Sequence, residues 1–459
     1  MLAQIEAINS AVNGVVWGPI MLILLVGTGI YLTLRTRGLQ ARRFGFILRS
    51  TIGSLFAKDK KKSGSEHNLT PFQAVSTALA GTVGTGNIAG VTGAIFVGGP
   101  GAVFWMWVSA FFGMMTKYAE IVLAVKYRQV DEKGAHYGGP MYYIEKGTGQ
   151  KWLAIIFALL GGIACFGIGN IAQSTEIAGA VQSLTGLAPL YTGIILAILT
   201  AIVVIGGVKR IGQVASYLVP LMAIFYIVAG VAIIVLRITD VPAALASIFT
   251  QAFSLEPREV GGGVAGYTIM VSMQQGVARG VFSNEAGLGS APMAHAASDT
   301  QEPAEQGMWG VFEVFVDTII ICTLTSMAIL LSGVLEYDLS SFASNGAAAA
   351  AAFNAILPGT LGGTVLQISL LFFALSTILG WSYYGERCWG YLSNNNKVVN
   401  IIFKIAFVLM CVVGSVGSGA LMWDISDTLN GMMAIPNLIG LLLLSGTVIQ
   451  VTRDYFGKK

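Results

Sequence analysis

Apolar runs of about 20 residues recur along the whole chain of 459 residues, and they constrain its fold more than any other feature. A helix of that length crosses a hydrocarbon layer roughly 30 Å thick. The composition agrees, because 55% of the residues are apolar, 11% are charged and the mean hydropathy is +0.73. Water-soluble globules do not have such a composition. We therefore predict an all-α polytopic protein that lies in a lipid bilayer as one integral domain over residues 1–459.

A helix-length window along the chain gives eleven candidate membrane spans. They cover residues 14–36, 70–97, 101–127, 152–184, 189–207, 211–237, 262–284, 306–334, 361–390, 398–420 and 429–452. The first span has no basic segment before it and is followed by basic residues, so we interpret it as a retained anchor and not as a signal peptide.

The distribution of lysine and arginine predicts the orientation of these spans. If the loops after every odd-numbered span face the cytoplasm, nearly all basic residues collect on that side, and only Arg237 and Arg258 fall outside. The positive-inside rule requires this asymmetry. We therefore expect a plasma (inner) membrane protein with its N-terminus outside and its C-terminus in the cytoplasm. The net charge of +3 gives no indication of nucleic-acid binding.

Two segments outside the spans have distinctive patterns. Residues 39–56 mix arginines with large apolar side chains, which is typical of an interfacial helix on an anionic leaflet, although a plain basic loop fits equally well. The alanine-rich stretch from Gly346 to Ala352 predicts a short helix that caps the outer vestibule.

The second span carries the sequence AGTVGTGNIAG at its centre, residues 80–90. Each glycine costs roughly 1 kcal/mol relative to alanine in a helix interior, and Thr82, Thr85 and Asn87 compete for backbone hydrogen bonds. A break near the bilayer midplane would expose carbonyl groups to a cation and a half-helix N-terminus to an anionic group. The alternative is that these glycines only allow close packing of neighbouring helices.

A similar interruption is expected in the seventh span, in the sequence MQQGVARG from Met273 to Gly280. If the span at 14–36 is set aside, the two interrupted spans are the first members of two groups of five, at 70–237 and 262–452, that face opposite ways. This pattern is typical of an inverted five-helix repeat with its binding site between the broken helices.

Uncharged polar residues dominate the other spans near that expected site. Asn170 and Gln173 lie one turn apart in the fourth span, and Ser376 and Thr377 lie near the middle of the ninth. Phe166, Met273 and Trp381 are candidates for an apolar wall that limits side-chain size. In membrane helices, such polar residues more often bond one helix to another, and large residues more often pack.

Charged residues within the spans are functional candidates by default. Lys117 and Glu120 lie three positions apart, which predicts an ion pair within one helix. We expect Glu176 toward the outer half, Asp317 in the inner half and Arg279 just past the second break. Each of these three is a candidate for a gate or a proton-responsive group.

Four stretches of the chain resemble the alanine or glycine:cation symporter family. They are GTVGTGN at 81–87, GGPGAVFWMWVSAFFGMMTKYAE at 98–120, GVFSNEAGLGSAPMAHAA at 280–297 and FALSTILGWSYYGER at 373–387. The resemblance extends over nearly the whole chain. It implies a sodium-coupled carrier of alanine, glycine or a similarly small amino acid, with the five-plus-five inverted repeat of LeuT-like, or APC-type, transporters and one extra N-terminal helix.

The resemblance also implies roles for individual residues. Substrate contacts are expected from Thr82, Gly84, Thr85, Gly86, Phe166, Asn170, Gln173, Met273, Gln274, Gly276 and Trp381. Sodium is expected at the carbonyls of Ala80 and Val83 and the hydroxyls of Ser376 and Thr377, because hard oxygen ligands suit a hard cation. Asn87 resembles a residue that holds a second sodium ion in relatives. Trp381 would shorten the pocket, so that it takes a small side chain.

The predicted function is sodium-coupled import of a small neutral amino acid by alternating access, with no enzymatic activity and no cofactor other than the co-transported ion. A proton-coupled or sodium-independent carrier of the same substrates is the main alternative, and a cation channel is a distant one. A membrane-embedded enzyme is disfavoured because His67, His136 and His295 are scattered and no Walker lysine motif is present. Sequence indicates nothing about the oligomeric state.

Overall fold

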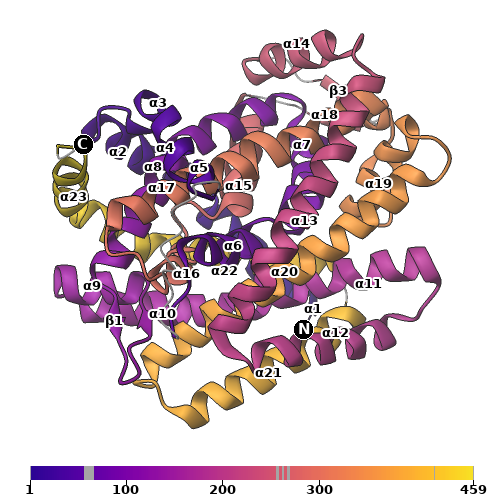
Figure 1. The fold of residues 1–459 in the computed structure, drawn as a ribbon. Helices are drawn as coiled ribbons and strands as arrows, with labels where there is room; N and C mark the ends of the chain where they lie inside the picture. The colour runs from indigo at the N-terminus through magenta and orange to yellow at the C-terminus, as the bar shows by residue number, and fades with distance from the viewer. Residues whose placement is uncertain are drawn as a thin grey trace.

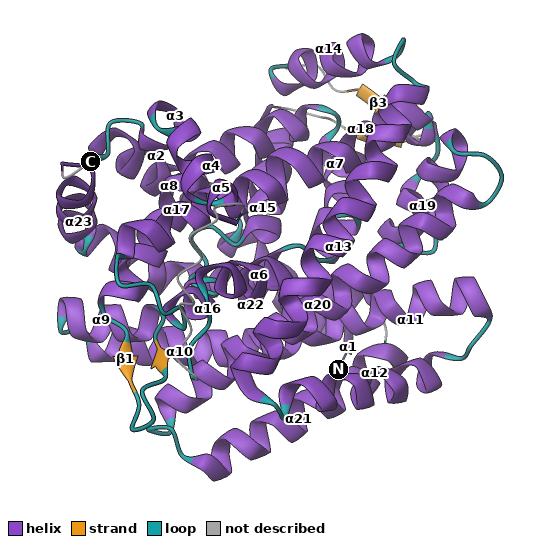
Figure 2. Cartoon of the chain, viewed as in Figure 1, coloured by secondary structure: helices purple, strands orange, loops and turns teal. Residues whose placement is uncertain are grey.

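The computed structural model describes residues 2–55, 67–254, 258–260, 263–265, 269–417 and 419–457. Helices make up most of this part of the chain, and the strands in it form two short antiparallel hairpins (Figure 2). Lysines 60–62 of the expected cytoplasmic loop, most of residues 262–268 at the start of the expected seventh span, and residue 418 lie outside the described residues.

The N-terminal third of the fold leads into the first half of the bundle (Figure 1). Its elements are α1 (Leu2–Val16), α2 (Pro19–Arg35), α3 (Leu39–Arg42), α4 (Phe44–Ser50), α5 (Ile52–Leu55), α6 (Pro71–Thr82), η1 (Thr85–Asn87), α7 (Ala89–Gly98), α8 (Gly101–Lys126), β1 (Gln129–Val130), β2 (His136–Tyr137) and α9 (Pro140–Thr148). The segment 39–56 is therefore helical where it is described, although it is divided into three short helices.

The middle of the chain, residues 151–332, contributes further helices to the bundle. They are α10 (Lys151–Phe166), the π-helical η2 (Gly167–Ile171), α11 (Ala172–Thr185), α12 (Pro189–Val204), α13 (Gly207–Leu236), α14 (Val241–Ala252), α15 (Ile269–Asn284), α16 (Pro292–Ala296), α17 (Pro303–Val314), the π-helical η3 (Phe315–Cys322) and α18 (Thr323–Ser332). Strands β3 (Arg258–Val260) and β4 (Gly263–Ala265) lie beside α14 at the edge of the molecule (Figure 1).

The C-terminal part completes the bundle. It comprises η4 (Val334–Glu336), η5 (Leu339–Ser341), α19 (Asn345–Ile356), α20 (Leu361–Leu392), α21 (Lys397–Val416), α22 (Gly419–Leu443) and α23 (Ser445–Gly457). Helix α19 contains the alanine-rich stretch and is capped by Ser344, whose side chain accepts a hydrogen bond from the Ala347 N–H, 3.1 Å away. The expected short helix is therefore present.

Seven helical stretches in the described part of the chain are long and apolar enough to cross a membrane. Two bent helix pairs satisfy the same criterion jointly: α6 with η1 and α7, bent by 58°, and α22 with α23, bent by 59°. The exposed large apolar side chains gather on the outward faces of α12, α13 and α21, where lipid would cover them.

Most expected spans end within a few residues of an observed helix, but the first and the last differ. The first helical stretch begins at Leu2 instead of residue 14, and α22 begins at Gly419 instead of residue 429. Polar residues near both helix starts lower the mean hydropathy there, so a hydropathy window places each start too late. Asn13 of α1 and Asp427 of α22 bind each other, because the Asn13 amide donates a 3.3 Å hydrogen bond to the Asp427 carboxylate.

Candidate functional site

The glycine-rich sequence at 80–90 breaks its helix as predicted. Helix α6 ends at Thr82, Val83 and Gly84 have extended backbones, and α7 begins at Ala89. The Asn87 side chain substitutes for the missing helical acceptor, because its Oδ1 accepts a 2.8 Å hydrogen bond from the Gly84 N–H. All these residues are buried, so the unwound backbone lies inside protein and not in lipid.

The second break lies later than the sequence predicts. Helix α15 runs without interruption through Met273–Gly280 and ends at Asn284, so the prediction of a break there was wrong. Its glycines serve close packing: a Cβ atom added to Gly276 would lie 2.2 Å from the carbonyl oxygen of Ala102 in α8. The break occupies residues 285–291, and α16 starts at Pro292.

Backbone conformation explains why the chain turns at this second break. Gly287 and Gly289 have φ angles of +96° and +83°, and Glu285 has a φ of +55°. Glycine adopts such angles without steric cost, whereas a glutamate does so only when its surroundings impose them. The sequence signal was present in NEAGLGSAP, residues 284–292, within a stretch that resembles the family.

Between the two breaks lies a small cavity of about 10 Å³. It is lined by Gly81, Thr82, Gly84, Gly86, Ile168, Gln173, Phe282, Glu285, Thr377 and Trp381. The walls thus come from both breaks, from the π-helical turn η2 with α11, and from the middle of α20. The predicted site residues among them are Thr82, Gly84, Gly86, Gln173, Thr377 and Trp381. Glu285, Gly81, Ile168 and Phe282 were missed.

Gln173 joins α11 to the first break. Its Oε1 accepts a 3.3 Å hydrogen bond from the Thr85 N–H, and its Nε2 donates to the carbonyl of Ile168. Two buried side-chain oxygens close to the break, Thr85 Oγ1 and Tyr384 OH, have no hydrogen-bond partner among the described residues. Buried polar atoms without partners are uncommon, so they mark a place where an ion, a water or a ligand would be bound.

Six predicted substrate residues do not line the cavity. Thr85 lies in the first break itself, where its N–H donates to Gln173. Phe166 packs against the rings of Phe403 and Phe407 in α21, and Asn170 donates a 2.7 Å hydrogen bond to the Phe407 carbonyl. Met273, Gln274 and Gly276 lie within the unbroken α15. The Gln274 amide donates to the Trp17 carbonyl at 3.1 Å, so it faces the junction of α1 and α2. The later position of the second break explains why Met273, Gln274 and Gly276 do not line the cavity.

The predicted sodium ligands lie where α6 meets α20. These helices approach closely, since a Cβ atom added to Gly380 would lie 2.7 Å from the Gly81 nitrogen. A Cβ atom added to Gly84 would lie 2.4 Å from Thr377 Oγ1, so this hydroxyl touches the first break. Ser376 and Thr377 both donate their hydroxyl hydrogens to the Phe373 carbonyl, which leaves their oxygen lone pairs free to accept or to coordinate. Ala80 and Val83 are buried.

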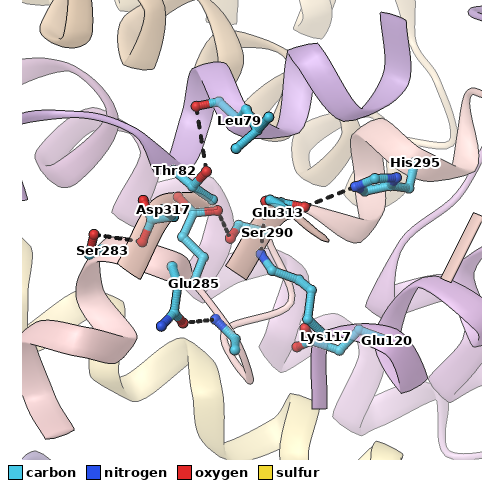
Figure 3. Close-up of polar contacts among 12 residues, drawn as sticks. Leu79, Thr82, Lys117, Glu120, Ser283, Glu285, Ser290, His295, Glu313 and Asp317 are labelled. Carbon is cyan, nitrogen blue, oxygen red and sulfur yellow. Dashed lines mark hydrogen bonds and ion pairs between the residues drawn. The ribbon is translucent and has the colours of Figure 1, made fainter. Parts of the chain in front are cut away.

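A buried carboxylate, Asp317 of η3, adjoins the first break on its other side. Asn87 donates to Asp317 Oδ1 at 2.7 Å. Ser283 donates to Oδ2 at 2.8 Å (Figure 3). Thr318 donates to the same Oδ2, also at 2.8 Å. Asp317 therefore connects the end of α15 with the turn after Gly84, a position that its sequence neighbours alone do not indicate.

The expected Lys117–Glu120 ion pair is absent, because each residue has another partner. The Lys117 ammonium lies 3.2 Å from Glu313 Oε1 of α17, and His295 Nε2 lies 3.0 Å from Glu313 Oε2 (Figure 3). Glu120 instead accepts a 3.1 Å hydrogen bond from the Gly287 N–H in the second break. Packing of α17 against α8 brings Glu313 to Lys117. Glu313 therefore pairs with the lysine, whereas Glu120 binds the second break.

A second, larger cavity of about 810 Å³ lies along α7, α11, α15 and the start of α19, and we call it the vestibule. Its walls include Ala89, Gly90, Gly93, Val97, Thr175, Glu176, Gly179, Ala180, Gln182, Ser183, Gln275, Arg279, Leu339, Ala343, Ser344, Asn345, Gly346, Ala347, Gln367, Leu370, Trp423, Asp424 and Asp427. The N-terminal turn of α19 is therefore part of this wall. Glu176 also lies there.

An ion pair lies in the wall of the vestibule. The guanidinium of Arg279 makes two contacts with the Asp427 carboxylate, at 3.1 and 3.3 Å. Arg279 also lies over the ring of Phe282, which stacks on Trp423. Arg279 and Trp423 line the vestibule and Phe282 lines the small cavity, so these side chains lie between the two cavities. The sequence predicts Arg279 just past the second break. In the structure it lies before that break, within α15.

Comparison with solved structures defines the class of fold. The crystal structure of MhsT in complex with L-phenylalanine superposes with a TM-score of 0.58 at 15% sequence identity, covering 85% of this chain and 99% of that one. At that identity the likeness concerns the fold alone, which is that of LeuT-type membrane transporters.

Comparison of sequences then identifies the family. A profile of the Sodium:alanine symporter family matches residues 2–459, and the chain belongs to this family. It is 48% identical to the Sodium/alanine symporter AgcS of Methanococcus maripaludis, over 97% of this chain and 96% of that protein. It is also 36% identical to the Probable sodium/glutamine symporter GlnT of Bacillus subtilis, over 99% and 91% of the two chains.

Proposed function

We propose that this protein imports a small neutral amino acid, alanine or glycine, together with sodium. The observation that carries this proposal is the meeting of two helix breaks with the Thr377 hydroxyl around a buried cavity, with the larger vestibule nearby. Unwound backbone offers carbonyls to a cation and N–H groups to a carboxylate at the same place. A zwitterion with a co-transported cation requires both.

The proposed substrate position is the small cavity. The amino acid's carboxylate would face the backbone N–H groups between Gly84 and the start of α7, where the partial positive charge of a helix N-terminus favours an anion. Its side chain would point toward Trp381. The cavity of about 10 Å³ in this conformation holds little more than one water, so substrate entry requires Phe282 and its neighbours to move.

Two positions are proposed for sodium. The first lies between the carbonyls of Ala80 and Val83 and the hydroxyls of Ser376 and Thr377, which would join α6 to α20. The second lies at Asn87, where the Asp317 carboxylate and the Ser283 hydroxyl supply further hard oxygen atoms. An anionic ligand is favourable there because it offsets the charge of the ion in a region without bulk water.

The proposed transmembrane arrangement has eleven spans. Nine of them are the seven long apolar helices and the two bent pairs. The shorter helices α12 and α15 are proposed as the other two. One helical stretch at the N-terminus, 14–36 in the sequence prediction, stands outside two inverted groups at 70–237 and 262–452. The vestibule would face outward, with the C-terminus in the cytoplasm.

A single coupled sodium ion supplies enough energy for uptake. One positive charge that crosses a potential of 100 mV releases about 2.3 kcal/mol. A tenfold sodium gradient adds about 1.4 kcal/mol. Together they support roughly 500-fold accumulation of a neutral zwitterion, since each 1.4 kcal/mol is a factor of ten.

Uptake of labelled alanine into liposomes that contain the purified protein tests the proposal. We expect accumulation that depends on an inward sodium gradient and is inhibited by unlabelled glycine. If uptake depends on a pH gradient and not on sodium, the coupled ion is the proton and the sodium proposal is wrong. If labelled glutamine accumulates and alanine does not, the proposed substrate size is wrong.

A further inference from the structure

Glu285 holds a position that the proposed function does not yet explain. It is the first residue of the second break, it is 1% exposed, and it is a non-glycine residue with a left-handed φ of +55°. Residues in such conformations persist when their surroundings hold them, and they cluster at functional sites. The side chain lines the small cavity.

Both carboxylate oxygens of Glu285 are engaged. Oε1 accepts a 2.8 Å hydrogen bond from the indole Nε1–H of Trp381 in α20. Oε2 accepts a short hydrogen bond from the Ser290 hydroxyl at the far end of the same break (Figure 3). The carboxylate therefore connects the break with the middle of α20, across the cavity wall.

The indole of Trp381 is held on its other sides by packing. A Cβ atom added to Gly169 would lie 2.3 Å from Trp381 Cβ, so only glycine leaves room there for this side chain. The ring of Tyr384 meets the indole edge-on, with 5.5 Å between ring centroids. Packing restricts where the indole lies, and the directional N–H bond to Glu285 selects its orientation.

We propose that Glu285 is a positioning residue that holds Trp381 as the fixed end wall of the cavity and thereby sets the largest side chain the carrier accepts. The inference rests on the proposed function. Without the carboxylate, the buried indole N–H has no acceptor, so the ring turns toward another partner and the wall recedes. The pocket then admits longer side chains.

The test measures how strongly unlabelled valine and methionine inhibit labelled alanine uptake, each relative to unlabelled alanine. In Glu285→Ala we expect the preference for alanine over valine to fall about tenfold, as for the loss of a close-fitting apolar contact. Glu285→Gln keeps both hydrogen bonds, because its amide oxygen accepts from Trp381 and its nitrogen donates to Ser290. We expect Glu285→Gln to keep a preference for alanine over valine close to that of the wild type, even if its rate of alanine uptake changes.

Trp381→Phe provides an independent variant, because it removes the indole N–H and leaves Glu285 in place. It should relax the preference as Glu285→Ala does, and the double variant should relax it no further, since both changes remove the same contact. Tyr391→Phe is the matched control. It removes another ring-to-carboxylate hydrogen bond, of 2.8 Å to Glu145, away from the cavity, and should leave the preference unchanged.

Three outcomes would overturn the inference. An unchanged preference in a Glu285→Ala protein that still accumulates alanine shows that Trp381 does not depend on this carboxylate. Loss of alanine binding in Glu285→Gln shows that the negative charge itself contacts the substrate. Additive effects in the double variant show separate roles. Failure of the wild type to accumulate any amino acid would instead disprove the proposed function.

Discussion

At the scale of single residues, the hydroxyls of α20 make the clearest connection between sequence and proposed chemistry. Ser376 and Thr377 donate to the same Phe373 carbonyl, so each keeps oxygen lone pairs for a cation. Thr377 touches Gly84 at the first break. A hydroxyl in that place can coordinate an ion that connects α6 and α20.

Thr377→Ala should raise the sodium concentration for half-maximal alanine uptake by about tenfold, the loss expected from removing one hydrogen-bond-strength ligand of about 1.4 kcal/mol. Sodium titration of uptake in liposomes measures it. Thr364→Ala is the matched control, because Thr364 also lies in α20 and also donates to the carbonyl four residues earlier. Equal sodium dependence in both variants would contradict the assignment of Thr377.

At the scale of helices, small residues determine which elements approach closely. Gly276 in α15 lies against the backbone of α8, so α15 stays straight where its glycines suggested a break. The N-terminal segment supports the ion pair at the vestibule. Asn13 and Trp17 donate hydrogen bonds to the side chain and the carbonyl of Asp427, the partner of Arg279 at the vestibule.

Gly276→Ala tests the packing role of this glycine. Its added methyl group would lie 2.2 Å from a backbone oxygen, so α15 and α8 must separate, and we expect a loss of about 1–3 kcal/mol in stability. The midpoint of thermal unfolding in detergent should fall. Gly27→Ala in α2, which has open space around it, should leave that midpoint unchanged or raise it slightly. A stable Gly276→Ala protein would refute this explanation.

At the scale of the whole molecule, the vestibule is a large open cavity, whereas the Lys117–Glu313–His295 cluster and the second break are buried. We propose that the vestibule is the side from which substrate enters. All four cysteines of the chain are buried, so an introduced surface cysteine would react with little background.

Cysteine labelling tests the orientation of the molecule. Ser183→Cys lies at the vestibule and should react with a membrane-impermeant maleimide in intact cells, whereas Lys133→Cys in the β1–β2 turn should react only after permeabilisation. Sodium with alanine should slow the reaction at position 183 if binding closes the vestibule. The reverse accessibility would invert the proposed topology.

Sequence by itself determined the helical membrane class, most helix boundaries and the break at residues 80–90. These depend on local properties, namely apolar length, glycine content and competing side chains. Tertiary structure decided what local properties leave open. Gly276 packs and does not break its helix, Lys117 pairs with Glu313 and not with Glu120, and Trp381 finds the Glu285 carboxylate 96 residues earlier. In each case, a backbone preference or a charge can be satisfied in several ways, and the neighbouring helix selects one.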